Sequence, residues 1–363
     1  MPQPTSSNRR TYLDWARGIA VLLMIEAHTF DAWTLPGARA TVAFRDVTIL
    51  GGFAAPLFLW LAGVGVVMAA TNAARRSGQR TAGVSAACRR GLEIFILAFL
   101  FRLQGLIVSP GGHLVTLFRV DILNIMGPAM VVAALVWGST AMPALQVVLF
   151  AVLAVATTML TPIVRVSPLV ERLPTILQWY VRPFADLTLF TLFPWAGFVF
   201  AGAACGVLLM AASDERVERR LHAWIALAGL LILFTGRYLA SAPSIYRQSS
   251  FWTTSPTYYA IRVGILMTAV SALYGLARVL EPRGIRLAPL ARFGRESLFV
   301  YWIHVELVYG YATWPIRHRL PVAGSFIACV LFTVLIYAAV VGKGRFMDRR
   351  RLRNRGREPA SAA

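Results

Sequence analysis

Residues 14–30 read DWARGIAVLLMIEAHTF, and the next residue is Asp31. The stretch is apolar over most of its length, as a helix in a lipid bilayer must be, yet it contains Arg17, Glu26 and His28. An ionisable side chain at the centre of a membrane costs about 3 kcal/mol on insertion scales. A membrane segment that contains several such groups is therefore a candidate functional segment.

The rest of the chain has the composition of a membrane protein. Of its 363 residues, 58% are hydrophobic and 14% are charged, and the mean hydropathy is +0.64. A soluble chain of this length needs more charged residues to cover its surface. Apolar runs of about 20 residues recur along the sequence. They predict an all-α, polytopic bundle of about ten transmembrane helices, at 18–33, 48–70, 91–109, 122–137, 142–164, 189–211, 221–240, 261–280, 297–313 and 322–341.

The net charge of +20 indicates the orientation of these helices. With both termini in the cytoplasm, two thirds of the 36 Lys and Arg residues fall on the cytoplasmic side, where positive residues are retained. We expect a cytoplasmic segment (1–11), a transmembrane domain (12–342) and a disordered basic tail (343–363). Because the tail follows a membrane span, its arginines favour binding to anionic lipid over binding to nucleic acid.

Several common sites are missing from the sequence. It contains no Walker motif, no HExxH motif and no dinucleotide-binding glycine pattern. The three cysteines, Cys88, Cys205 and Cys329, have no paired spacing. The sequence therefore predicts neither a metal site nor a disulfide bond.

Arg17 and His28 lie on one side of the first helix. Their separation of 11 residues corresponds to three turns plus about 20°, or about 16 Å along the axis. Arg17, at the cytoplasmic end, could hold a phosphate group in two hydrogen bonds, or it could be only a topology anchor. His28, in the outer half, could act as an acid–base group oriented by Asp31 one turn further on, or it could be a packing residue. Glu26 points elsewhere, and we expect it to pair with Arg102.

A second candidate segment is residues 290–311, LARFGRESLFVYWIHVELVYGY. His304 lies near the middle of its predicted helix, with Glu306 two positions on. An imidazole at mid-depth in a membrane favours a functional role. We expect Glu296 to cap the start of this helix.

A third candidate is residues 118–131, FRVDILNIMGPAMV, which start a helix on the same outer side as His28. Asp121 and Asn124 are three residues apart and share one helix face. Together with Arg119 they could bind polar groups of an acceptor. Capping of the helix by Asp121 is an equally good interpretation.

Five segments resemble, in order, bacterial relatives of heparan-alpha-glucosaminide N-acetyltransferase, which are related to the acyltransferase-3 proteins. They are RTYLDWARGIAVLLMIEAH (10–28), APLFLWLAGVGV (55–66), FRVDILNIMG (118–127), LFPWAGFVFAGAACG (192–206) and FGRESLFVYWIHVELVYG (293–310). The resemblance extends from Arg10 to about Val341. The Arg-x10-His spacing of Arg17 and His28 is typical of the acyltransferase-3 group.

The resemblance implies a bacterial inner-membrane enzyme that moves an acyl group, usually acetyl, from cytoplasmic acyl-CoA to an extracytoplasmic glycan or similar acceptor. Arg17, with Asp14 beside it, would hold CoA, and His28 would be the base. The candidate acceptor-binding residues, from their placement in the sequence, are Arg119, Asp121, Asn124 and Glu306. No metal is implied, and a second copy of the chain is a candidate partner.

One departure from the family bears on the catalytic residue. In human-type enzymes an asparagine aligns with His28 and the working histidine lies in the following loop, whereas residues 29–46 here contain no histidine. The chain would therefore use His28 in the acyltransferase-3 manner, His304, or neither. The alternative function class is a transporter in which Glu26, His28, Arg102 and His304 form a relay for protons or anions.

Overall fold

The computed structural model describes residues 10–108 and 113–355, and side chains as far as residue 350. These residues are helical, and among them only two isolated β-bridges, Thr34–Leu320 and Val120–Thr188, are found in place of strands. The predicted all-helical class is confirmed. The chain divides into two compact units, which we call the terminal unit (residues up to 54 and from 286) and the central unit (55–285).

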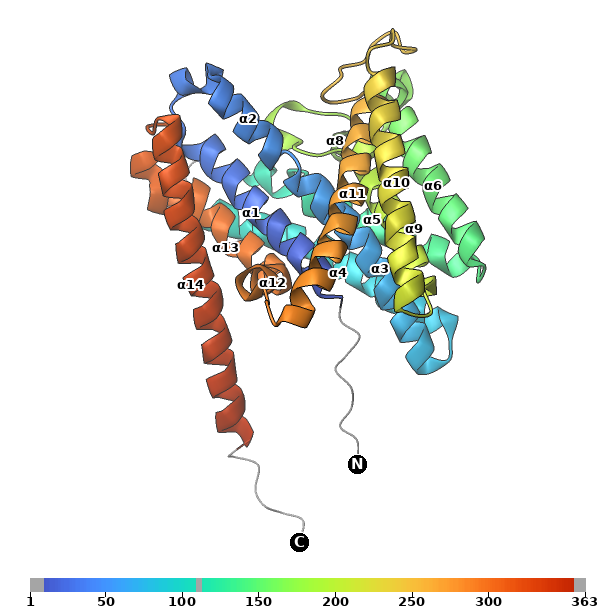
Figure 1. The fold of residues 1–363 in the computed structure, drawn as a ribbon. Coiled ribbons are helices and arrows are strands. Elements are labelled where there is room, and N and C mark those ends of the chain that lie inside the picture. The colour runs from blue at the N-terminus through green and yellow to red at the C-terminus, as the bar shows by residue number, and fades with distance from the viewer. Residues whose placement is uncertain (1–9, 109–112, 356–363) are drawn as a thin grey trace. The chain divides into compact units, whose positions relative to one another are not determined.

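The central unit is built from helices that pack in sequence-local pairs, α4 with α5 and α10 with α11, together with the pair α6 and α9 (Figure 1). Its helices are α3 (Ala54–Ser77), α4 (Arg80–Val108), α5 (Ile122–Ser139), α6 (Pro143–Met159), α7 (Thr161–Val166), α8 (Thr175–Val181), α9 (Leu192–Ala211), α10 (Glu215–Leu239) and α11 (Pro256–Leu280). Short 3-10 turns lie at Leu114–Phe118, Pro168–Arg172, Ala185–Leu187 and Glu281–Arg283.

Glycines let these helix pairs approach closely. A Cβ atom on Gly91 of α4 would lie 2.9 Å from the carbonyl oxygen of Gly127 on α5, and one on Gly127 would lie 2.7 Å from that of Gly91. Gly229 of α10 and Gly264 of α11 face each other in the same way, at 2.8 and 2.5 Å. Small residues at helix crossings are typical of membrane bundles, where packing rather than the hydrophobic effect holds helices together.

Local sequence signals set the helix ends. The Asp214 side chain accepts a hydrogen bond from the backbone N–H of Val217 at 3.0 Å and so caps α10. This hydrogen bond lowers the pKa of the Asp214 carboxyl. At the C-terminal end of α5, Gln146 and Arg80 donate hydrogen bonds to the backbone carbonyls of Trp137 and Thr140. The last carbonyls of a helix lack partners within it, so these side chains complete α5.

In the terminal unit, α1 is the helix that the others contact. It spans Thr11–Trp33 and packs against α2 (Val42–Gly51), α12 (Ala288–Arg295), α13 (Ser297–Tyr309) and α14 (Val322–Arg355). The 3-10 turns Pro36–Ala40 and Tyr311–Ile316 complete the unit. Close to the start of α1, Gly294 fits against the backbone of Asp14, and Gly18 fits against the backbone of Leu290. The N-terminal turns of α1 are thereby joined to α12.

The structure supports a multi-pass membrane protein but not the full count of ten spans. Eight stretches of the described helices are long and apolar enough to cross a membrane: Val42–Ser77, Arg80–Val108, Ile122–Ser139, Pro143–Val166, Leu192–Ala211, Glu215–Leu239, Pro256–Arg283 and Val322–Arg350. The predicted spans 18–33 and 297–313 coincide with α1 and α13. However, α1 carries too many charges for this criterion, and α13 has only 13 residues. Ten spans and the position of the termini therefore remain predictions.

Two details differ from the sequence-based expectation. The predicted span 48–70 is divided, because α2 ends at Gly51 and α3 begins at Ala54. The basic tail, expected to be disordered from residue 343, continues α14 as a helix to Arg355, and α14 extends well past α12 in Figure 1. Arg and Leu are good helix formers, so a helix that has already formed can continue through them. Residues 356–363 lie outside the described residues.

Candidate functional site

The centre of the terminal unit is a pair of histidines from distant parts of the sequence. His28 on α1 and His304 on α13 are joined by a 2.8 Å hydrogen bond between His28 Nδ1 and His304 Nε2. Their rings are nearly parallel, with an interplanar angle of 8°. His304 is completely buried, whereas His28 is only partly buried. We call His28 and His304 the histidine pair; it brings together the two imidazoles that the sequence singled out.

The hydrogen bonds of the histidine pair define which nitrogen atoms carry protons. His304 Nδ1 lies 2.8 Å from the carbonyl oxygen of Val300, one turn earlier on α13. A carbonyl oxygen can only accept, so His304 Nδ1 must be the donor, and in the neutral ring its Nε2 is then an acceptor. His28 Nδ1 must therefore donate to His304 Nε2. The remaining nitrogen, His28 Nε2, has a lone pair and no hydrogen-bond partner among the described residues.

Asp31 lies beside the histidine pair but is held by other groups. Tyr309 on α13 donates its hydroxyl proton to Asp31 Oδ2 at 2.8 Å, and its ring makes an edge contact with His28 at 5.7 Å between centroids. Arg39 forms an ion pair with Asp31 Oδ1 at 3.7 Å and donates to His318 Nδ1 at 3.2 Å. No hydrogen bond joins Asp31 to His28 among the described residues. The contact expected to orient His28 is thus made by His304.

Arg17 and Asp14 form an ion pair near the start of α1. The distance between Arg17 Nη1 and Asp14 Oδ1 is 3.3 Å. Asp14 is buried, whereas about a third of the Arg17 side chain is exposed. Asp14 therefore directs a guanidinium group that remains accessible, about 16 Å along the α1 axis from His28.

In the central unit, Arg102, Asp121 and Asn124 form a second polar group, which we call the cap cluster. Asp121 Oδ1 accepts from the backbone N–H groups of Leu123 and Asn124, and the Asn124 side chain accepts from the backbone N–H of Asp121 at 3.0 Å. This reciprocal capping box starts α5. Arg102 donates to Asp121 Oδ2 at 2.8 Å, and Asn124 also contacts the Tyr180 hydroxyl at 3.4 Å. The capping interpretation of Asp121 is confirmed.

The prediction that Glu26 pairs with Arg102 is wrong, because Arg102 pairs with Asp121. The Glu26 carboxylate lies beside Gly51 of α2, and both its oxygens are buried without a hydrogen-bond partner among the described residues.

The remaining predicted residues make no hydrogen bond to the histidine pair among the described residues. Glu306 is buried on α13, but it is two positions after His304 and therefore lies about 200° around the helix from it. Arg119 is partly buried just before the cap cluster. Glu296 occupies the N-cap position of α13, but its side chain makes no capping hydrogen bond and instead pairs with Lys343 at 2.5 Å. Its predicted capping role is wrong.

Sequence reasoning missed Val300, Arg39 and Tyr309. The carbonyl of Val300 carries no side-chain signal, and Arg39 lies in a loop whose path the sequence does not reveal. Tyr309 has a signal, since it follows His304 by five residues, but an aromatic residue at the end of a membrane helix is also typical of the interfacial belt. Within residues 10–108 and 113–355, no group of three or more His, Cys, Asp and Glu side chains is placed to hold a metal ion.

Comparison with known families places these residues in context. A family model described as heparan-alpha-glucosaminide N-acetyltransferase, catalytic, matches residues 9–246. No curated protein matches the sequence. The matched region includes Arg17, His28 and the cap cluster, and it ends before His304.

Proposed function

The chain belongs to the family of heparan-alpha-glucosaminide N-acetyltransferase catalytic domains, and we propose that it transfers an acetyl or similar acyl group from cytoplasmic acyl-CoA to a hydroxyl or amine of an extracytoplasmic glycan. The family is one of transferases, and the helices are those of a multi-pass membrane protein. The bacterial inner membrane, the donor and the acceptor are parts of the proposal.

The observation that carries this proposal is the lone pair on His28 Nε2. A general base must have an unprotonated nitrogen within reach of the proton that it removes. The hydrogen bonds from His304 to Val300 and from His28 to His304 consume the other three ring nitrogens of the histidine pair. His304 thus supports the base, as the third member of a catalytic triad orients its histidine.

The proposed reaction is a direct transfer. His28 Nε2 removes the proton from the acceptor hydroxyl or amine while the acceptor oxygen or nitrogen attacks the thioester carbonyl carbon. A bond forms between the acceptor and the acyl carbon, the carbon–sulfur bond breaks, and His28 Nε2 delivers the proton to the departing sulfur. Throughout the reaction, His28 Nδ1 keeps its proton and donates it in a hydrogen bond to His304 Nε2. By accepting this hydrogen bond, His304 stabilises the transient positive charge on His28.

Arg17 suits the donor end of this reaction. The partly exposed guanidinium, directed by Asp14, can donate two parallel hydrogen bonds to a phosphate of CoA. CoA places a long flexible arm between its phosphates and its sulfur, which is compatible with the distance of about 16 Å from Arg17 to His28. For the acceptor, Arg119 and Glu306 remain predicted contacts. Asp121 and Asn124 are weaker candidates for acceptor binding, because the capping box already uses their polar atoms.

Donor binding gives the most direct test. In the purified full-length protein, we expect Arg17→Ala to weaken acetyl-CoA binding about tenfold, a usual effect of losing one charge-assisted hydrogen-bond donor. Arg17→Lys, the matched control, retains the charge without the two-pronged geometry and should lose less. Calorimetry measures the affinity of both variants for acetyl-CoA. Release of free thiol from acetyl-CoA reports acyl transfer to each of a panel of sugars. Solute uptake that does not depend on CoA would contradict the proposal and favour a transporter.

A further inference from the structure

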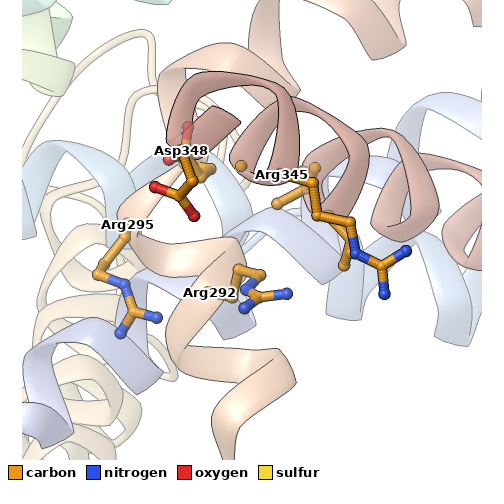
Figure 2. A pocket seen from close by; sticks show the side chains of 8 residues that line it. Arg292, Arg295, Arg345 and Asp348 are labelled. Atoms are coloured by element: carbon orange, nitrogen blue, oxygen red, sulfur yellow. The ribbon is translucent and has the colours of Figure 1, made fainter. Parts of the chain in front are cut away.

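A pocket with a volume of about 260 Å³ lies between α12 and α14 of the terminal unit (Figure 2). Arg292 and Arg295 reach it from α12, and Arg345 and Asp348 reach it from α14. In Figure 2, Asp348 is directed toward the two arginines of α12. This pocket, which we call the basic pocket, belongs to none of the sites described above.

Positive charge dominates the basic pocket. Glu296 also lines it, but Lys343 neutralises this carboxylate at 2.5 Å. Asp348 is then the one remaining acidic group against the three arginines. Among the described residues, none of these three guanidinium groups takes part in an ion pair. Three arginines and one carboxylate lining the same pocket leave an excess of positive charge, which attracts anions.

The basic pocket lies at the same end of the terminal unit as Arg17. The helix α12, which provides Arg292 and Arg295, is packed through Gly294 against the backbone of Asp14, one turn before Arg17. The positive-inside pattern of the sequence places this end at the cytoplasmic face. Both phosphorylated cofactors and the head groups of anionic lipids are present at that face.

We propose that the basic pocket binds a phosphate ester, held by Arg292, Arg295 and Arg345. Guanidinium groups bind phosphate through two parallel N–H···O hydrogen bonds, so three of them can surround one phosphate group. The volume of the pocket is several times the share of a water molecule in the liquid, about 30 Å³, and is sufficient for such a group. Asp348 opposes binding and limits the affinity.

Two sources can supply this phosphate. One is the nucleotide part of CoA, an interpretation that rests on the proposed function. The other is the head group of an anionic phospholipid, which requires no enzymatic activity at all. The chemistry of the pocket is the same for both, and the choice of probe separates them.

The test measures binding to the purified full-length protein for three variants. We expect Arg345→Gln to weaken binding about tenfold, through the loss of one charge-assisted contact. We expect Asp348→Asn to strengthen binding severalfold, because it removes the opposing charge. A misfolded protein would not bind more tightly, so the second variant separates charge from folding. Arg349→Gln, on the same helix but outside the pocket, is the matched control and should change nothing.

Two probes distinguish the sources. CoA is titrated calorimetrically into protein in neutral detergent, and phosphatidylglycerol is titrated into protein in phosphatidylcholine nanodiscs. Sensitivity of CoA binding to Arg345 and Asp348 assigns the pocket to the nucleotide, and sensitivity of phosphatidylglycerol binding alone assigns it to lipid. If neither probe responds to these substitutions, the inference is overturned. Because binding is measured without turnover, an absence of acyl transfer would contradict only the proposed function.

Discussion

The histidine pair and the cap cluster are both polar groups in an otherwise apolar protein, but they differ in how completely their hydrogen-bond acceptor atoms are used. In the cap cluster, Asp121 accepts from two backbone N–H groups and from Arg102, while Asn124 completes the capping box. In the histidine pair, three of the four ring nitrogens are used by two hydrogen bonds, and His28 Nε2 has no hydrogen-bond partner among the described residues.

This difference separates a structural role from a chemical one. A buried acceptor atom whose donors all belong to the fold stabilises the fold. A network that ends in a single unused lone pair, beside a partly exposed ring, can accept a proton from a substrate. Substitutions in the two clusters should therefore affect different quantities, stability in one and catalysis in the other.

The largest effect is expected from His28→Ala. Removal of the general base should lower the rate of acyl transfer by two to four orders of magnitude, the usual contribution of such a group. The unfolding temperature should change little, because His28 is only partly buried. Thiol release from acetyl-CoA measures the rate, and His113→Ala, at an exposed histidine of the central unit, is the control. Full activity of His28→Ala would remove this histidine from the mechanism.

Asp121→Ala should produce the opposite result. It deletes the cap of α5 and leaves Arg102 buried without its carboxylate, and losing one partner of a buried ion pair costs about 3 kcal/mol or more. We expect a clear loss in the free energy of unfolding, measured by denaturant titration in detergent, with normal turnover in the protein that remains folded.

A double variant sharpens this prediction. Arg102→Met combined with Asp121→Asn retains a capping side chain and removes both charges, so much of the lost stability should return. If Asp121→Ala instead abolishes turnover in a protein of normal stability, the cap cluster contacts substrate, and the contrast between the two clusters fails.

The sequence was sufficient to predict the helical fold class, because this class depends on runs of hydrophobic residues, which are local features. It also identified His28 and His304 separately, because an ionisable residue stands out in a membrane helix. It could not predict that they meet, since 276 positions separate them and the pairing depends on the packing of α13 against α1.

The wrong predictions for Glu26 and Glu296 have a common physical origin, because the sequence does not show which charged side chains meet in the fold. Glu26 was paired with Arg102 on charge alone, although Asp121 is closer to Arg102 in sequence and its carboxylate also caps α5. The position of Glu296 at the helix start predicts a cap, whereas Lys343, on the distant helix α14, provides the stronger partner. The helix α1 carries too many charges, and α13 is too short, to count as a membrane span by length and composition, and they are the two helices that carry the histidine pair.

A smaller effect is expected from His304→Leu, which keeps the size of the side chain but removes the acceptor for His28 Nδ1–H. One hydrogen bond contributes about 1 kcal/mol, so turnover should fall about fivefold. His304→Gln can place an amide oxygen near the position of Nε2 and should recover most of the activity. The nitrogen NMR spectrum of labelled histidine should show a proton on Nδ1 of His28 in the native protein. In His304→Leu it should show a mixture of both tautomers. An unchanged tautomer would mean that His304 does not position His28.

The smallest effect is expected from Tyr309→Phe. This substitution deletes the hydroxyl that donates to Asp31 but keeps the ring whose edge contacts His28. Asp31 is exposed and retains its ion pair with Arg39, so the loss of one hydrogen bond near solvent should lower turnover only about twofold to threefold. The same assay of thiol release measures it. A fall as large as that of His28→Ala would place Tyr309 and Asp31 on the path of the proton, and the unused nitrogen of His28 would then no longer be enough to explain the chemistry.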